Sequence, residues 1–168
     1  MVNPAPQALQ SDSLRHIRAA LLPWQSTPIG TGAARTWLTS TDSLTRKLVA
    51  HSEGQFAVQV LHQGVAFCSP GRGITSMHHG LYWQREVQLL GHQEPWVRAL
   101  TFVPARHRRL CTRLHLLGEQ PLGAFLFKQP DLQRQQMDYA ATPWGLARRA
   151  RFSIGHQQII LVELFLNQ

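Results

Sequence analysis

A chain of 168 residues is long enough for one domain with a buried core, and no repeat or change of composition divides it. Its 17 Lys and Arg against 9 Asp and Glu give a net charge of +8, which indicates an anionic partner: nucleic acid, an acidic membrane surface or a small polyanion. Cys68 and Cys111 form no CxxC motif, which argues against a disulfide framework and favours a reducing compartment. No signal-type segment or membrane-length apolar run is present, so we expect a soluble, cytoplasmic protein without stable membrane insertion.

The first quarter of the chain predicts short elements. Residues 1–13 are polar and contain proline, which indicates a loose arm, and residues 14–22 have the apolar spacing of a short helix. Residues 25–34, with a proline and two glycines, are expected to be a connection. The cluster of N-cap residues before Leu44 predicts a helix that begins near Ser43.

Further along, apolar and β-branched runs bounded by turn residues predict strands. A turn joins the second strand to the third, and Gly155–His156 is expected to turn a second hairpin at 154–161. Between the strands we expect a basic helix over 106–117 and another helix from Pro121. Residues 68–80 predict a long loop, and 130–142 give no clear element. The predicted strands are 55–61, 81–90, 96–103 and 159–166.

The last strand carries a charge at its centre. Residues 159–166 are apolar on both faces, which is typical of a strand inside a sheet, yet Glu163 lies in the middle of them. Removing a carboxylate from water is costly. Glu163 must therefore be neutral, or it must face a cation or a ligand.

A second inward charge lies on the strand over 81–90. Period-two alternation puts Arg85 on the apolar face, and a guanidinium there needs an anion, so Arg85 on a neighbouring strand is the expected partner of Glu163. Two explanations remain open: a structural ion pair, or a cavity in which Arg85 holds a substrate carboxylate and Glu163 meets a polar group at its far end. The opposite face, expected to meet water, carries Tyr82, Gln84, Glu86 and Gln88.

Other features bear on the ligand. Helix N-termini at Leu44 and Leu122 offer backbone N–H groups to the same anion, and Gly123 either leaves the second one accessible or allows close packing. No acid or cysteine completes a metal site around His78–His79, so no metal is expected. The arginines of 106–109 have no interleaved aromatic residues, which favours a solvated helix face over nucleic-acid binding.

Short motifs follow one another from about Trp37 to the C-terminus. They are Trp37-Leu38, Asp42–Leu48, Arg85–Leu90, Glu94–Val97, Val103-Pro104, Leu117-Gly118, Pro121–Gly123 with Leu126-Phe127, Ala147–Arg149 and Glu163–Leu166. In this order and spacing the set resembles the chorismate lyase family. The sequence departs from that pattern at Leu100 and Ala150, where relatives often carry Arg and Ser.

The resemblance implies an α+β fold: a single domain, 1–168, with an antiparallel sheet of about six strands and helical flaps over an internal ligand pocket. It implies a cofactor-independent lyase, a monomer that eliminates pyruvate from chorismate to give 4-hydroxybenzoate, the first committed step toward ubiquinone. Arg85 and the backbone N–H groups of Leu44 and Leu122 would hold the ring carboxylate. Glu163 would meet the 4-hydroxyl end or protonate the leaving oxygen.

Two other functions stay open. A domain of the same fold would bind a small aromatic acid as an effector without catalysis, although Met1–Thr36 is too short for a convincing DNA-binding segment. A nucleic-acid-binding protein would explain the +8 charge, but it would not explain an Arg and a Glu directed into the core.

Overall fold

The computed structural model describes residues 23–68 and 79–166. The predicted arm at 1–13, the predicted helix at 14–22 and most of the predicted loop at 68–80, including His78, lie outside these residues.

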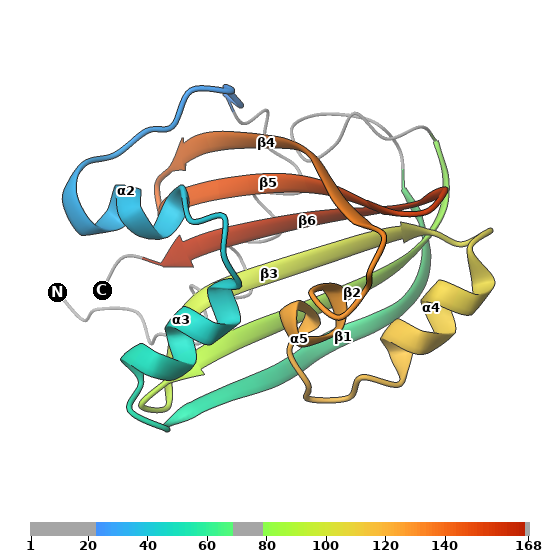
Figure 1. The fold of residues 1–168 in the computed structure, drawn as a ribbon, viewed down its shortest axis with the longest axis horizontal. Coiled ribbons are helices and arrows are strands. Elements are labelled where there is room, and N and C mark those ends of the chain that lie inside the picture. Colours follow the sequence, from blue (N-terminus) through green and yellow to red (C-terminus); the bar gives the residue numbers. More distant parts are fainter. Residues whose placement is uncertain (1–22, 69–78, 167–168) are drawn as a thin grey trace, which may run out of the picture.

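One six-stranded antiparallel sheet, in the order β1-β2-β3-β6-β5-β4, forms the framework (Figure 1). The chain builds one half with consecutive strands, crosses to the far edge, and returns until β6 pairs with β3. The expected α+β fold with about six strands is confirmed. The strands are β1 (Phe56–Cys68), β2 (Gly80–Gly91), β3 (Glu94–Pro104), β4 (Leu132–Thr142), β5 (Gly145–Ile154) and β6 (Gln157–Leu166).

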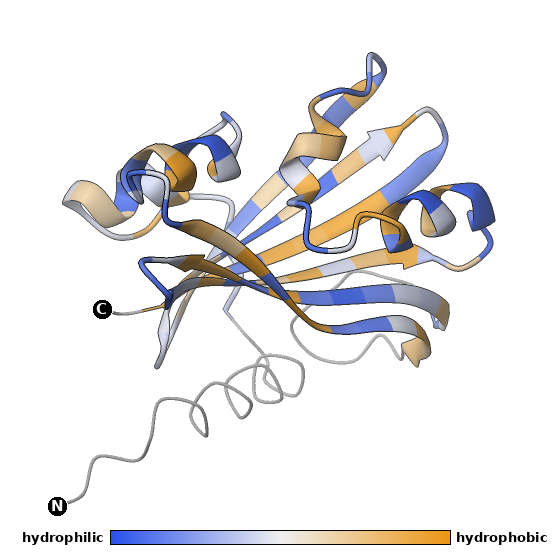
Figure 2. Ribbon diagram, turned by 90° about the horizontal axis from the view of Figure 1, so that it is seen from below, coloured by the Kyte–Doolittle hydropathy of each residue, from blue (hydrophilic) through white to orange (hydrophobic). Residues whose placement is uncertain are grey.

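The described helices all lie on one face of this sheet (Figures 1 and 2). Ser43 caps α3 as its sequence predicts, because its hydroxyl accepts a hydrogen bond from the backbone N–H of Arg46 at 3.4 Å. Within 23–68 and 79–166, no helix has the length and hydrophobicity needed to cross a membrane. The helices are α2 (Gly32–Leu38), α3 (Leu44–His51), α4 (Arg108–His115) and α5 (Leu122–Leu126).

Both faces of the sheet are buried, which the alternation in β2 did not predict. On the face under the helices, Trp83 of β2 lies in one buried cluster with Leu110 and Leu114 of α4. The opposite face was expected to meet water, but Tyr82, Gln84 and Gln88 are only 5–6% exposed. Apolar residues of the neighbouring strands lie on the same face. Together with Tyr82 they form a second hydrophobic core. This core contains Leu100, Phe102, Ala147, Ile160, Val162 and Leu164, with Trp24 and Trp144 packed against it.

Two elements escaped the sequence patterns. Helix α2 begins at Gly32, inside the stretch predicted to be a connection, and its N-cap Thr31 makes no side-chain cap hydrogen bond that would mark a start. Strand β4 occupies 132–142, where we assigned no element, because it is an edge strand rich in polar residues with a register shift between Arg134 and Gln136. Both elements contribute to the site described next.

Candidate functional site

A cavity lies between the helix-bearing face of the sheet and the N-terminal ends of α3 and α5. The residues predicted for a ligand site, Leu44, Arg85, Leu122 and Glu163, all line it. The structure therefore brings together residues that are up to 119 positions apart in the chain, since 163 − 44 = 119. Aliphatic side chains make up much of the remaining wall, among them Val58, Val87, Leu89, Leu126 and Leu161.

The expected pairing of Arg85 with Glu163 is wrong. Strand β3 lies between β2 and β6, so the two charges share a cavity but are not on neighbouring strands. Glu163 accepts a hydrogen bond at Oε2 from Nε of Arg148, which lies directly opposite it in the β5–β6 register. Arg148 and Glu163 are 4% and 5% exposed, so the pair is buried.

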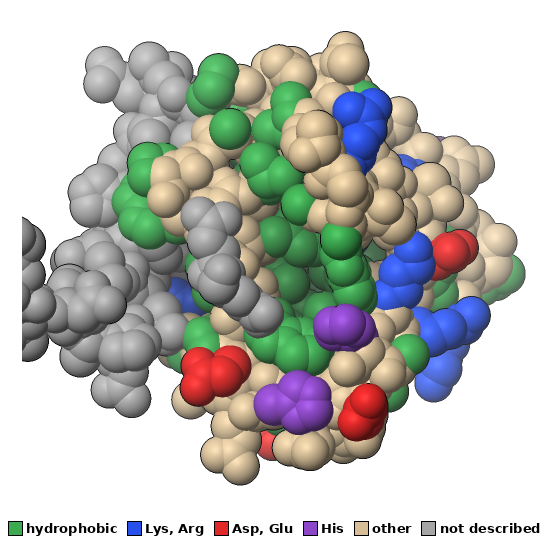
Figure 3. Space-filling view, turned by 90° about the vertical axis from the view of Figure 1, so that its left-hand side faces the viewer, with side chains coloured by type: hydrophobic (Ala, Val, Ile, Leu, Met, Phe, Trp, Pro, Cys, Tyr) green, Lys and Arg blue, Asp and Glu red, His purple; other side chains and the backbone are tan. Residues whose placement is uncertain are grey.

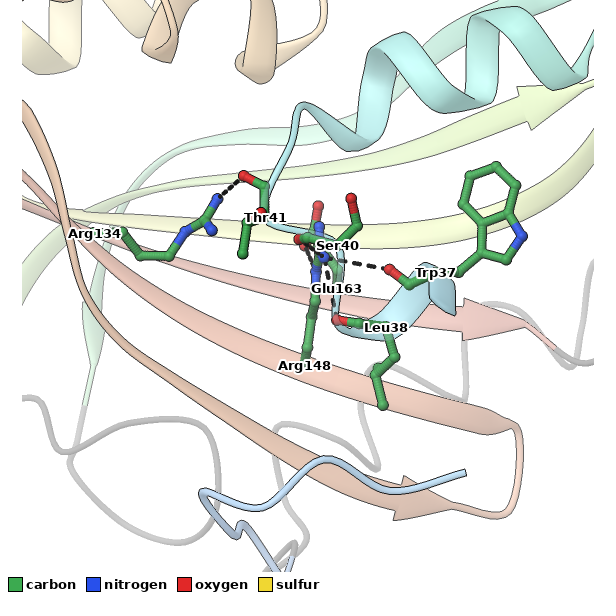
Figure 4. A network of polar contacts seen from close by, with 7 residues as sticks. All are labelled: Trp37, Leu38, Ser40, Thr41, Arg134, Arg148 and Glu163. Carbon is green, nitrogen blue, oxygen red and sulfur yellow. Dashed lines mark hydrogen bonds and ion pairs between the residues drawn. The ribbon is translucent and has the colours of Figure 1, made fainter. Parts of the chain in front are cut away.

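Arg148 also ties the sheet to the C-terminal end of α2 and to the segment that follows it (Figure 4). Its Nη1 donates to the backbone oxygens of Ser40 at 3.0 Å, Leu38 at 3.3 Å and Trp37 at 3.5 Å. Our sequence analysis missed this role. The signal was present, because a two-residue turn at Gly155–His156 pairs Ile154 with Gln157 and, counted back along the hairpin, Arg148 with Glu163.

Arg85 is a buried cation with hydrogen-bonding capacity to spare. It is 2% exposed, and its Nη2 donates to the carbonyl oxygens of Gly118 at 2.7 Å and Gln120 at 2.9 Å. Within the described part of the chain, its Nε and Nη1 have no hydrogen-bond partner. Burial lowers the pKa of Arg85, because the charged guanidinium has lost its hydration. An anion in the cavity would offset that cost.

Backbone donors surround the same space. Leu44 and Leu122 are the first residues of α3 and α5, where N–H groups have no acceptor within their own helix. Gly123 lets the two helices approach: a Cβ there would lie 3.0 Å from Thr45 Oγ1 and 3.2 Å from Ser43 Oγ. This geometry supports the close-packing explanation for Gly123.

A second hollow, at the end of the molecule where α2 and α3 lie, has a different character (Figure 3). Hydrophobic side chains gather there, and no Arg, Lys, Asp or Glu occurs among the described residues that line it. An organic anion is therefore better matched to the first cavity. The second hollow is lined by Ala33, Ala34, Trp37, Leu48, His51, Trp96, Val97, Leu146, Phe165 and Leu166.

The cavity contains a buried, incompletely paired arginine, a carboxylate held by another arginine, and two helix N-termini. These features define a binding protein for a small organic acid that also carries a polar group. No cluster of three or more potential metal ligands occurs among residues 23–68 and 79–166. The departure at Ala150 lies in the cavity wall, whereas Leu100 is buried in the core on the opposite face.

Comparison with known proteins gives the family. The chorismate lyase family model matches residues 20–168. The probable chorismate pyruvate-lyase of Marinobacter nauticus is 37% identical over 135 residues, which cover 75% of this chain and 70% of that protein. The chorismate pyruvate-lyases of Erwinia tasmaniensis (32% identical; 84% and 83% covered) and Sodalis glossinidius (35%; 80% and 77%) are also similar. The chain belongs to the chorismate lyase family.

Proposed function

We propose that this protein is a lyase that eliminates pyruvate from chorismate and leaves 4-hydroxybenzoate. Family membership supports the reaction. The observation that carries the assignment in this chain is Arg85, which lies buried in the cavity with N–H groups that no described residue accepts. We extend the proposal to a cytoplasmic, single-domain monomer that needs neither metal nor cofactor.

Arg85 and the N–H groups of Leu44 and Leu122 would bind the ring carboxylate. A guanidinium offers a planar fork of donors to a carboxylate, and helix N-termini add partial positive charge. Arg85 is anchored to the segment before α5 through Gly118 and Gln120, so its position is fixed before the ligand arrives. Such preorganisation reduces the cost of binding.

Glu163 would accept a hydrogen bond from the 4-hydroxyl group. Arg148 donates a hydrogen bond to its Oε2 and so holds the carboxyl group in place, with its oxygens as acceptors. In the reaction the bond from C3 to the ether oxygen breaks, the C4 proton leaves, and the released enolpyruvate takes up a proton to become pyruvate. Because aromatisation drives these steps, the protein mainly has to hold the dianion in a reactive pose.

The direct test adds chorismate to the purified protein and follows 4-hydroxybenzoate by absorbance and pyruvate with a coupled lactate dehydrogenase. We expect equal amounts of both products. Tight binding of 4-hydroxybenzoate without turnover would instead indicate a non-catalytic effector-binding domain of the same fold.

The same assay tests the metal-free mechanism. Arginines and backbone N–H groups supply the positive charge around the cavity, so treatment with EDTA should leave the turnover rate unchanged. A rate that falls after EDTA treatment and returns when a divalent cation is added would contradict the proposed site.

Gly123→Val should speed the release of product. A Cβ at this position already crowds the side-chain oxygens of Thr45 and Ser43, so the branched valine side chain is expected to push α3 away from α5. Overpacking typically costs about 1–3 kcal/mol, which predicts a dissociation rate about 5–150-fold higher if the closed, product-bound state bears that cost. Stopped-flow competition with labelled 4-hydroxybenzoate measures the rate.

Ala124→Val is the control, because this exposed neighbour lies in the same helix and receives the same β-branched side chain without facing α3 through Ser43 and Thr45. If both variants release product at the wild-type rate, separation of α3 from α5 does not limit release.

A further inference from the structure

The substrate of the proposed reaction carries a second carboxylate that the site must also bind. One carboxylate is attached to the ring and stays in the product, and the other is on the enolpyruvyl group and leaves with pyruvate. Among the described residues, the arginines that line the cavity are Arg85, Arg134 and Arg148. Arg85 is assigned above to the ring carboxylate, and Arg148 already donates to Glu163 and to backbone oxygens. Arg134 remains.

Arg134 is fixed in place but not fully paired. Its Nη2 donates to the backbone oxygen of Thr41 at 2.9 Å, and its guanidinium carbon lies 5.3 Å from the centre of the Phe152 ring (Figure 4 shows the first contact). Its Nε is buried and has no hydrogen-bond partner among the described residues. The side chain is thus held by one carbonyl and one aromatic face, with a donor left over.

The charges around Arg134 favour an added anion. Burial is the main factor that lowers its pKa, and the positive charge of Arg148 lowers it further, while Glu163, Tyr139 and the exposed Asp42 act in the opposite direction. The net shift is downward, so the negative groups already present do not compensate fully. A carboxylate beside Arg134 would offset the remainder.

The position of Arg134 also matches the shape of chorismate. The enolpyruvyl ether is on C3, next to the C4 hydroxyl, whereas the ring carboxylate is at the far end of the ring. The residue that holds the enolpyruvyl carboxylate must therefore lie near the residue that meets the hydroxyl. Arg134 is close enough to Glu163 for their charges to interact, and both lie beside the α2–α3 connection (Figure 4).

We infer that Arg134 binds the enolpyruvyl carboxylate, so that two arginines divide the dianion between them: Arg85 holds the carboxylate that stays in the product, and Arg134 holds the one that leaves. This inference rests on the proposed function. It gives Arg134 a contact with substrate that 4-hydroxybenzoate does not make.

Arg134→Gln should impair the use of chorismate without weakening the binding of 4-hydroxybenzoate. We expect kcat/KM for chorismate to fall about 10–150-fold, as for loss of a charged hydrogen bond, while the Kd for 4-hydroxybenzoate stays within about twofold. Arg134→Lys, which keeps the charge, should recover part of the loss. Arg151→Gln, a change of another half-buried arginine that does not line the cavity, should alter neither constant.

Equal losses for chorismate and 4-hydroxybenzoate, or no loss for either, would overturn the inference. If Arg134→Gln does not fold, the same two losses are compared for Arg134→Lys. A loss in kcat/KM for chorismate at least about fivefold greater than the loss in affinity for 4-hydroxybenzoate supports the inference, and equal losses overturn it. A wild-type protein that does not turn over chorismate would instead overturn the proposed function.

Discussion

Glu163→Gln is expected to lower the free energy of unfolding by about 3–5 kcal/mol, because it leaves the Arg148 guanidinium buried without the carboxylate that faces it. We expected such a cost only if Glu163 were a structural partner of Arg85, and the structure transfers that partnership to Arg148. Urea denaturation of the ligand-free protein measures the effect.

A double-mutant cycle with Arg148→Met shows how much of the loss belongs to the pair. The two side chains are in direct contact, so the combined variant should be more stable than the sum of the single losses predicts, by about 0.5–3 kcal/mol. Strictly additive losses would mean that the direct contact between the two side chains adds nothing to the free energy of unfolding.

Turnover per folded molecule reports the chemical role of Glu163. The glutamine amide oxygen still accepts a hydrogen bond but has no charge, so we expect a loss of about tenfold, the difference between a charged and a neutral hydrogen bond. A loss of about 10²–10⁴-fold would show that Glu163 transfers a proton. Unchanged activity in the folded fraction would remove Glu163 from the site and leave it a structural role.

Arg85→Lys should weaken the binding of 4-hydroxybenzoate by about 1–3 kcal/mol, or about 5–150-fold in Kd. Lysine has a single compact charge on a shorter side chain, and it cannot donate to Gly118, Gln120 and a carboxylate with the geometry of the guanidinium. Titration calorimetry measures the affinity. Unchanged affinity in a folded variant would exclude Arg85 from the site.

Arg85→Met distinguishes a ligand-binding arginine from a structural one. The free protein should not lose stability and should gain some, because a buried charge that faces no carboxylate is removed and the exposed Gly118 and Gln120 can turn to water. Arg149→Met is the control. Arg149 is paired with Asp138 at 2.6 Å and does not line the cavity, so its loss should cost stability without changing the affinity for 4-hydroxybenzoate.

The sequence by itself determined which face of β2 carries Arg85, where α3 begins, and four residues that line one cavity. Alternation along β2 is a local property of an extended chain, so the position of Arg85 on the face with Trp83, Val87 and Leu89 followed from spacing alone. The capping residues before Leu44 act within one helical turn, and they marked the start of α3 for the same reason. The ordered motifs added the family and the four residues proposed for its site, which line one cavity.

Only the tertiary structure decided which of these residues meet. The lateral order of strands depends on how α4 and α5 carry the chain from β3 to the far edge of the sheet, and periodicity within a strand carries no information about that path. β3 therefore separates Arg85 from Glu163, and the hairpin register pairs Glu163 with Arg148. The polar edge strand β4, whose register shift breaks its alternation, brings Arg134 to the cavity, because contacts with β5 hold it in place where its own sequence gives no strand signal.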